Sequence, residues 1–167
     1  MFFRYCLIFT LIVFLFSSKG EASHIVGGEL NYRYLGANLY EVRLVVYRDC
    51  LGGQAAFDDP ASIGVFNMQG NLVTSSDVYV NTINHLPNVI NSPCLTPPTN
   101  ICYEVGVYIL NMTLPPIPGG YQLVYQRCCR NYSILNIDLS PLPGATYIAT
   151  IPDTILCRVN SNPEFNF

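Results

Sequence analysis

The chain has few charged residues, and it has no apolar run long enough to span a membrane. Asp, Glu, Lys and Arg make up 11% of its 167 residues, and the basic residues form no cluster. The sequence therefore lacks the electrostatic footprint of a protein that binds nucleic acid or an anionic membrane surface. Its longest apolar run, over residues 5–16, falls short of the roughly 20 residues that a transmembrane helix needs. This shortfall argues against a membrane anchor.

The first 22 residues have the organisation of a cleavable export signal. Arg4 supplies a positive charge before the apolar run, and Gly20 and Ala22 supply the small residues that a signal peptidase reads before Ser23. We expect cleavage after Ala22, which leaves one domain of ordinary size and no membrane span. The remaining chain contains six arginines, no lysine and ten acidic residues, so it is mildly acidic.

Cysteine usage after the signal is typical of an exported, disulfide-bonded domain. Cys6 leaves with the signal, and the six cysteines that remain form an even number, which favours three disulfides. No two of them have the spacing of a zinc knuckle. We predict that disulfides form among Cys50, Cys94, Cys102, Cys128, Cys129 and Cys157.

The spacing of the cysteines suggests a pairing, although sequence alone leaves others open. Cys94 and Cys102 flank a short Pro-rich loop, so we expect them to bond to each other. Cys128 and Cys129 are neighbours on a predicted strand, where adjacent side chains face opposite ways. We therefore expect them to bond different partners, namely Cys50 and Cys157.

Apolar residues recur with period two from His24 onward, and no stretch after the signal has a helical stripe. This alternation, with Gly, Pro and Asn between the runs, predicts an all-β domain. Tyr103, Val105, Val107 and Ile109 are expected to share one face of their strand. The expected elements are a hairpin over 24–49, a second hairpin from 63–66 and 72–74, and strands over 103–113, 121–130 and 145–151.

Several short strands separated by turns are typical of a β-sandwich. We predict a disulfide-stapled antiparallel β-sandwich of immunoglobulin-like type over residues 23–153, although no tryptophan is present to mark a true immunoglobulin core. Residues 81–100 are rich in Asn and Pro and show no periodicity, so we expect a long surface loop there. Residues 154–167 are expected to be a linker or the start of a following β-module.

Three carboxylates are the candidate metal ligands. Asp49, Asp58 and Asp59 are hard oxygen ligands of the kind that calcium prefers, and extracellular β-domains often bind calcium between loops. Ordinary turn chemistry at Asp58-Asp59-Pro60 and an ion pair between Arg48 and Asp49 are the competing explanation. The same acids would have to serve a secreted hydrolase, but no pair of them is singled out by its context.

Arginines and tyrosines offer two further kinds of site. Arg43, Arg48, Arg127 and Arg130 are candidates for an anion site, but cross-strand pairs with Glu41 or Glu104 explain them more simply. Sugar stacking is one use for tyrosines on strands, and core packing is the commoner one. The tyrosines concerned are Tyr103, Tyr108, Tyr121, Tyr125 and Tyr132.

A protease is excluded despite one suggestive segment. Residues 25–28 read Ile-Val-Gly-Gly, which is similar to the start of activated trypsin-like enzymes. Those enzymes need a histidine base, a buried aspartate and a serine nucleophile on two barrels. The chain has only His24 and His85, and neither lies in a matching motif. We therefore predict no catalytic residues, no cofactor and no enzymatic activity.

Long strings of the sequence carry a family resemblance. They are Ser23–Leu30 (SHIVGGEL), Tyr40–Cys50 (YEVRLVVYRDC), Phe57–Phe66 (FDDPASIGVF), Leu114–Asn131 (LPPIPGGYQLVYQRCCRN), Ile134–Ile137 and Gly144–Pro152. In these segments the chain resembles the amino-terminal region of large secreted Bacteroidetes surface proteins. Those proteins usually end in a gliding-motility-associated, type B carboxy-terminal sorting domain read by the type IX secretion system. The similarity spans nearly all of the chain after the signal, and these segments are spread over it from Ser23 to Pro152.

The resemblance implies export and a place on the cell surface or in the medium, and it suggests a structural or adhesive module. The chain has no sorting domain before Phe167, so a periplasmic location is the expectation if it ends there. We expect a non-catalytic extracellular or cell-surface adhesion module of a gliding-motility-associated protein, with surface glycans or other cell-surface proteins as partners. The alternative is a calcium-dependent carbohydrate-binding module or a secreted hydrolase.

Overall fold

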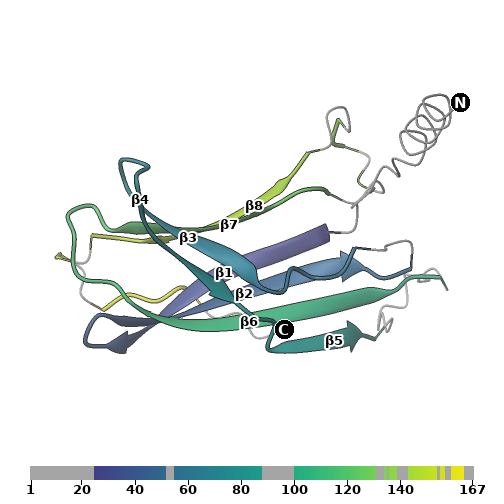
Figure 1. The fold of residues 1–167 in the computed structure, drawn as a ribbon, viewed down its shortest axis with the longest axis horizontal. Helices are drawn as coiled ribbons and strands as arrows, with labels where there is room; N and C mark the ends of the chain where they lie inside the picture. The colour runs from purple at the N-terminus through teal and green to yellow at the C-terminus, as the bar shows by residue number, and fades with distance from the viewer. Residues whose placement is uncertain are drawn as a thin grey trace, which may run out of the picture.

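The computed structural model describes residues 25–51, 55–87, 100–130, 134, 136–138, 143–153, 155–156 and 159–163. Every regular element in these residues is a β-strand, and the strands lie in two layers (Figure 1). The strands are β1 (Ile25–Gly36), β2 (Leu39–Asp49), β3 (Ala61–Asn67), β4 (Leu72–Val78), β5 (Thr82–Leu86), β6 (Tyr103–Thr113), β7 (Tyr121–Arg127) and β8 (Ala145–Ile151).

The eight strands form two four-stranded sheets that pair antiparallel throughout. The first sheet has the order β1-β2-β6-β5 and the second has the order β4-β3-β7-β8, so successive strand pairs alternate between the layers. This is the ABED and C′CFG strand order of immunoglobulin-like sandwiches. The predicted fold class is confirmed.

The first hairpin joins β1 and β2 through a tight turn. Ala37 and Asn38 both have positive φ, at 49° and 62°, as a primed hairpin turn requires. Leu30 pairs with Leu44 and Tyr32 with Val42, so the apolar side chains of both strands fall on one face. The predicted hairpin is confirmed from Ile25 onward, and His24 lies outside the described residues.

The second hairpin pairs β3 with β4 around residues 67–71, as predicted. The side-chain oxygen of Asn67 accepts hydrogen bonds from the backbone N–H groups of Gln69 and Asn71, at 3.1 and 2.9 Å. Gly70 has φ of +80°, which glycine adopts without steric cost. An asparagine turn of this kind orders the loop without support from the core.

One segment that we predicted to be a loop contains a strand. Residues 82–86 form β5, which pairs with β6 from Thr82 opposite Val107 to Leu86 opposite Tyr103. All five residues of β5 are exposed, because the strand lies at the edge of its sheet. Their sequence has no apolar alternation, so the pairing with β6, distant in sequence, decides the structure. The remainder of the predicted loop, residues 88–99, lies outside the described residues.

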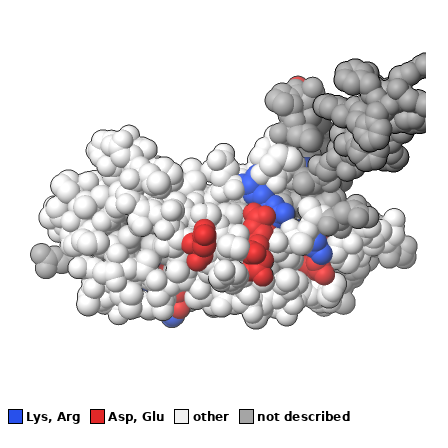
Figure 2. All heavy atoms as spheres, viewed as in Figure 1, with Lys and Arg blue, Asp and Glu red and all other residues white. Residues whose placement is uncertain are grey.

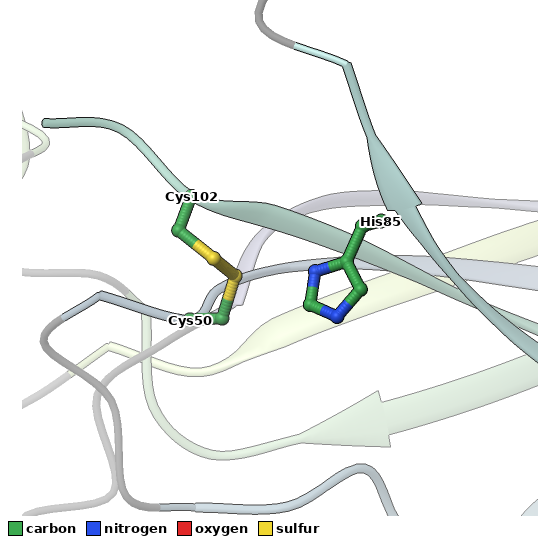
Figure 3. A group of neighbouring side chains, drawn as sticks. All are labelled: Cys50, His85 and Cys102. Atoms are coloured by element: carbon green, nitrogen blue, oxygen red, sulfur yellow. A yellow bond between two sulfur atoms is a disulfide. The ribbon is translucent and has the colours of Figure 1, made fainter. Parts of the chain in front are cut away.

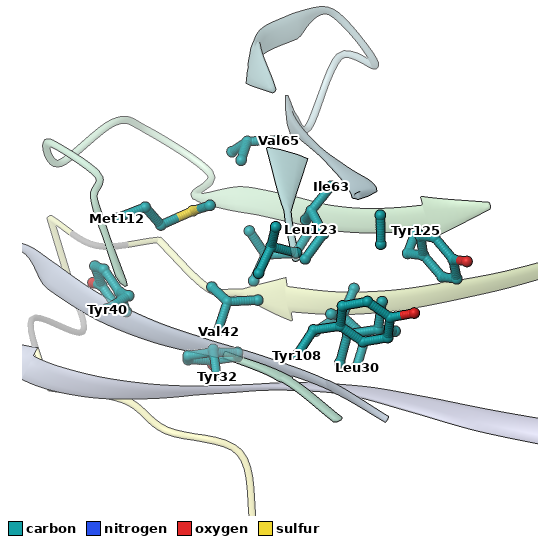
Figure 4. Packing of buried hydrophobic residues seen from close by; sticks show 14 of the residues in the cluster. Leu30, Tyr32, Tyr40, Val42, Ile63, Val65, Tyr108, Met112, Leu123 and Tyr125 are labelled. Atoms are coloured by element: carbon teal, nitrogen blue, oxygen red, sulfur yellow. The ribbon is translucent and has the colours of Figure 1, made fainter. Parts of the chain in front are cut away.

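The core lies between the sheets and contains several tyrosines (Figure 4). Tyr40, Tyr108, Tyr121 and Tyr125 are among the largest fully buried side chains. The hydroxyl group of Tyr121, at the start of β7, donates a hydrogen bond to the backbone carbonyl of Pro115. This contact fixes the corner between β6 and β7 in the way that the tyrosine corner does in immunoglobulin-like domains.

A segment near the end of the described chain lies along the edge of β1. Asn162 donates its backbone N–H to the carbonyl of Tyr32 at 2.9 Å, and its side-chain oxygen accepts the N–H of Tyr32 at the same distance. Ser161 Oγ accepts the N–H of Tyr34 at 3.0 Å, and Asn160 Oδ1 accepts the Tyr32 hydroxyl at 2.8 Å. These bonds occupy backbone groups that an edge strand otherwise leaves open.

Candidate functional site

A disulfide joins the end of β2 to the start of β6. Cys50 bonds to Cys102, and the Cys50 N–H also donates to the Cys102 carbonyl at 3.0 Å. The bond staples neighbouring strands of one sheet, whereas the disulfide of antibody domains connects the two sheets. The predicted bond between Cys94 and Cys102 is therefore wrong. The prediction assumed that a short local loop closes between Cys94 and Cys102, whereas the pairing of β2 with β6 brings Cys50 next to Cys102.

The adjacent cysteines Cys128 and Cys129 bond to each other. We predicted that they would face opposite ways along a strand and bond Cys50 and Cys157, and this prediction is wrong. Strand β7 ends at Arg127, so the alternation of side chains does not extend to the cysteines. Cys94 and Cys157 lie outside the described residues.

His85 lies beside the Cys50–Cys102 disulfide (Figure 3). One ligand atom from each of Cys50, His85 and Cys102 lies within 4.8 Å of the other two. In the part of the chain that the structure describes, no other group of three or more His, Cys, Asp or Glu side chains is this close. We did not predict this cluster, because His85 belongs to the segment that was expected to be a loop.

Glu104 connects His85 to an arginine. Its carboxylate lies 3.2 Å from His85 Nε2 and accepts a hydrogen bond of 2.7 Å from Arg48 Nε. Arg48 also donates to the carbonyl of Ala55 at 2.5 Å, and its guanidinium lies 5.2 Å from the ring centroid of Phe57. The predicted cross-strand pair of Arg48 with Glu104 is confirmed. Since both side chains are largely buried, this pair fixes the position of the carboxylate beside the histidine.

The three candidate calcium ligands do not gather into one cluster among the described residues. Asp58 accepts a hydrogen bond of 2.6 Å from the Tyr125 hydroxyl and lies 3.4 Å from Arg127. Asp59 Oδ1 accepts the N–H of Val80, and Asp49 Oδ1 accepts the N–H of Leu51, both at 2.9 Å. Each carboxylate therefore has a structural use, as the turn chemistry indicated.

The contacts of Asp58 place two phenols in the core. The Tyr108 hydroxyl donates to the backbone carbonyl of Asp58 at 2.8 Å, and both Tyr108 and Tyr125 are 1% exposed. Burial, reinforced by the charge of Asp58, raises the pKa of Tyr108 to about 12. Burial also raises the pKa of Tyr125, to which the hydrogen bond with Asp58 adds. Both phenols therefore stay protonated well above neutral pH.

The residues considered as candidates for an anion site or a sugar site mostly have structural uses. Arg127 donates to the carbonyl of Ala56 at 2.6 Å, Arg130 donates to that of Gly144 at 3.2 Å, and Arg43 lies 3.7 Å from a carboxylate oxygen of Glu29. The tyrosines considered for sugar stacking are buried in the core, except for Tyr103, which is 37% exposed, and Tyr132, which lies outside the described residues.

The outward face of the first sheet carries a second group of apolar residues. Val45 is outside the core cluster and is 2% exposed. Val107 lies opposite Val45, and Tyr103 lies opposite Leu86. We call this surface the outer patch, and it consists of Tyr47, Leu86, Tyr103, Val105, Val107 and Ile109.

The protease-like segment is part of the sheet. Ile25, Gly27 and Gly28 pair with β2, and Ile25 is buried. A Cβ on Gly28 would lie 2.9 Å from the ring of Tyr147 and 2.7 Å from the carbonyl oxygen of Val45. The glycine therefore permits close packing of β8 against β1, which is the ordinary structural use of a strand glycine.

Comparison of the chain with models of protein families, with curated proteins and with solved structures finds no match. Within the described residues, no helix is long and apolar enough to cross a membrane. The function is therefore inferred from the residues and their geometry.

Proposed function

We propose that this chain is a non-catalytic extracellular or cell-surface adhesion module of a gliding-motility-associated surface protein. The export signal and the disulfides support an extracytoplasmic location, because structural disulfides persist in oxidising compartments. The observation that carries the proposal is the outer patch, a group of exposed and half-buried apolar residues on the face of the first sheet that points away from the second sheet. Contiguous exposed apolar surface on a small domain is typical of an interaction site.

The partner that the outer patch fits best is another cell-surface protein. Four of its six residues are aliphatic, and Leu86 and Ile109 are 39% and 43% exposed. Aliphatic side chains with flanking tyrosines resemble the apolar centre of protein interfaces. Glycan recognition relies on exposed aromatic rings, and within the outer patch Tyr103, at 37%, is the exposed aromatic residue.

The edge of the same sheet offers a second element of contact. Strand β5 lies at the edge next to β6, and its residues are exposed. An edge strand can accept a strand from a partner through backbone hydrogen bonds, while neighbouring side chains provide specificity. Charged residues occupy a small part of the face seen in Figure 2. We therefore expect apolar contact and strand pairing to contribute more to affinity than long-range electrostatics.

An adhesion assay tests the proposal. The purified exported protein is immobilised, and the binding of bacterial cells to it is counted. Replacing Tyr103 and Ile109 together by Ser should lower binding by about 30-fold, the factor for interface residues that contribute 2 kcal/mol.

The matched control replaces two residues of the other sheet, Leu72 and Ile148, by Ser. They are 59% and 56% exposed, so the control removes a similar apolar surface from the opposite layer. Circular dichroism and melting should show that both variants stay folded. Equal losses in the two variants, or no cell binding by the parent protein, would exclude the outer patch as an adhesion surface.

A further inference from the structure

We propose that Cys50, His85 and Cys102 form a redox-gated binding site for a thiophilic metal ion, with Zn²⁺ as the ion that the donor set fits. In the oxidised protein the disulfide occupies both sulfur ligands. When the disulfide is reduced, two thiolates and one imidazole nitrogen become available at one place. Two cysteines and one histidine are a ligand set that zinc sites use, with the fourth position left to water.

The three ligands are attached to neighbouring strands that backbone hydrogen bonds also hold together. Cys50 follows β2, Cys102 precedes β6 and His85 lies on β5, and these strands are consecutive neighbours in one sheet. The hydrogen bond of 3.0 Å from the Cys50 N–H to the Cys102 carbonyl continues the β2–β6 ladder past the last paired residues. Reduction therefore requires side-chain rotation rather than a rearrangement of the backbone.

The distances suit a metal ion. A tetrahedral zinc site with Zn–S distances near 2.3 Å and a Zn–N distance near 2.0 Å places its donor atoms about 3.5–3.8 Å apart. The donor atoms of Cys50, His85 and Cys102 already lie within 4.8 Å of one another. Opening of the disulfide lets the two sulfurs move apart to the required separation. The exposed side chain of His85 leaves a path by which the ion can enter.

The histidine is already oriented for ligation. Its Nε2 lies 3.2 Å from the Glu104 carboxylate, and the other ring nitrogen points toward the disulfide (Figure 3). Metal-bound histidines are typically held in this way, with one nitrogen on the metal and the other on a carboxylate. Arg48 in turn fixes Glu104 through the 2.7 Å hydrogen bond from its Nε. The outer shell of the site is therefore present before any metal arrives.

The gating reaction is an ordinary thiol–disulfide exchange. Two molecules of a thiol reductant give up two hydrogens and form one disulfide, while the Cys50–Cys102 bond breaks and each sulfur gains a hydrogen. Binding of the ion then releases both thiol protons to the solvent, because cysteine ligates as the thiolate. Oxidation of the two sulfurs by a disulfide reverses the sequence and expels the ion.

Cobalt(II) is the probe for the test, because its binding to thiolates gives a charge-transfer absorption band. The full chain, exported and purified in its oxidised form, is compared with protein reduced by a water-soluble phosphine, which becomes the phosphine oxide with oxygen from water. After anaerobic removal of the phosphine, the reduced protein should show the band at one equivalent of Co²⁺, and Zn²⁺ should displace it. The oxidised protein should show no band.

Variants identify the ligands. Replacing Cys50 and Cys102 by Ser should abolish the band, and replacing Cys94, Cys128, Cys129 and Cys157 by Ser should retain it. His85→Ala should lower the affinity at least 10-fold, while His24→Ala should not change it. Glu104→Gln should lower it 10- to 100-fold through the outer shell.

Three outcomes would overturn the proposal. They are a reduced protein that is unfolded by circular dichroism, a band that survives replacement of Cys50 and Cys102, and an affinity that is unchanged in His85→Ala. Because the His85 side chain is 72% exposed, His85→Ala should keep the fold. This variant therefore tests the proposal even if a cysteine variant fails to fold.

Discussion

Alkaline pH should destabilise this protein through its buried phenols, and Tyr108 provides the measurable case. Its pKa is raised to about 12, whereas an unfolded tyrosine titrates at 10.0. Between these values the native state keeps a proton that the unfolded chain loses, so the stability conferred by Tyr108 is complete below pH 10 and declines as the pH rises toward 12. At pH 11 the loss from this one residue is about 1.4 kcal/mol.

Tyr108→Phe separates this effect from other alkaline effects. At pH 7 the variant loses the part-buried hydrogen bond to the Asp58 carbonyl, which costs about 1.5 kcal/mol because the carbonyl is left without this partner. At pH 11 only the parent protein loses stability through Tyr108. The penalty of the substitution should therefore fall from about 1.5 kcal/mol to near zero.

Urea unfolding at pH 7 and pH 11, followed by circular dichroism, measures both free energies. The difference in midpoint between parent and variant should shrink by about 0.5–1 M between the two pH values. Tyr79→Phe is the control, because its side chain is 69% exposed, and its effect should be the same at both pH values. A Tyr108→Phe penalty that is equal at pH 7 and pH 11 would refute the reasoning.

Three further predictions concern the disulfide, an acid and a glycine. Replacing both Cys50 and Cys102 by Ser should lower the free energy of unfolding by about 4 kcal/mol, because the bond closes a loop of sequence separation 52; urea unfolding measures this, and an unchanged midpoint would contradict it. Backbone hydrogen bonds, led by the one that the Gly119 N–H donates, lower the pKa of the Asp153 carboxyl below its ordinary 3.8, so the stability that this carboxylate confers is present above pH 3.8 and is lost as the pH falls. The free energy of unfolding should therefore fall less steeply with decreasing pH in Asp153→Asn than in the parent protein, as acid unfolding will show. Gly120→Ala should lower the melting temperature more than Gly70→Ala, since both glycines have φ near +80° but only at Gly120 would a Cβ meet backbone, at 2.1 Å from the Ile151 carbonyl oxygen. Equal shifts in melting temperature would contradict this prediction.

Sequence patterns predicted the strands whose signals are local. The alternation from Tyr40 to Val46 and the turn at 36–38 lie next to each other in the chain, so side-chain period and glycine content suffice to predict the first hairpin. The strand from Tyr103 to Thr113 was likewise bounded correctly, because Leu114 and the prolines after it end the ladder.

Contacts between distant segments could not be predicted in the same way. Strand β5 has no apolar alternation in its sequence and forms because β6 offers it a partner, so His85 reaches the Cys50–Cys102 disulfide only through tertiary pairing. The cysteine pairing depended on where β2, β6 and β7 end, and strand ends are poorly determined by alternation. The opposite charges of Arg48 and Glu104 were the one available signal, and no local pattern places His85 near the other two residues.

Alternation predicts which residues share a face, but it does not predict which face is inward. The shared face of Tyr103, Val105, Val107 and Ile109 is confirmed, yet it points outward, while Tyr108 and Met112 from the opposite face fill the core. Packing of the two sheets therefore does not require the apolar character of the outward face. An apolar surface that the core does not use costs solubility and favours aggregation. The apolar character of the outer patch is accounted for if another protein covers the patch. This is the physical reason for proposing the outer patch as the adhesion surface.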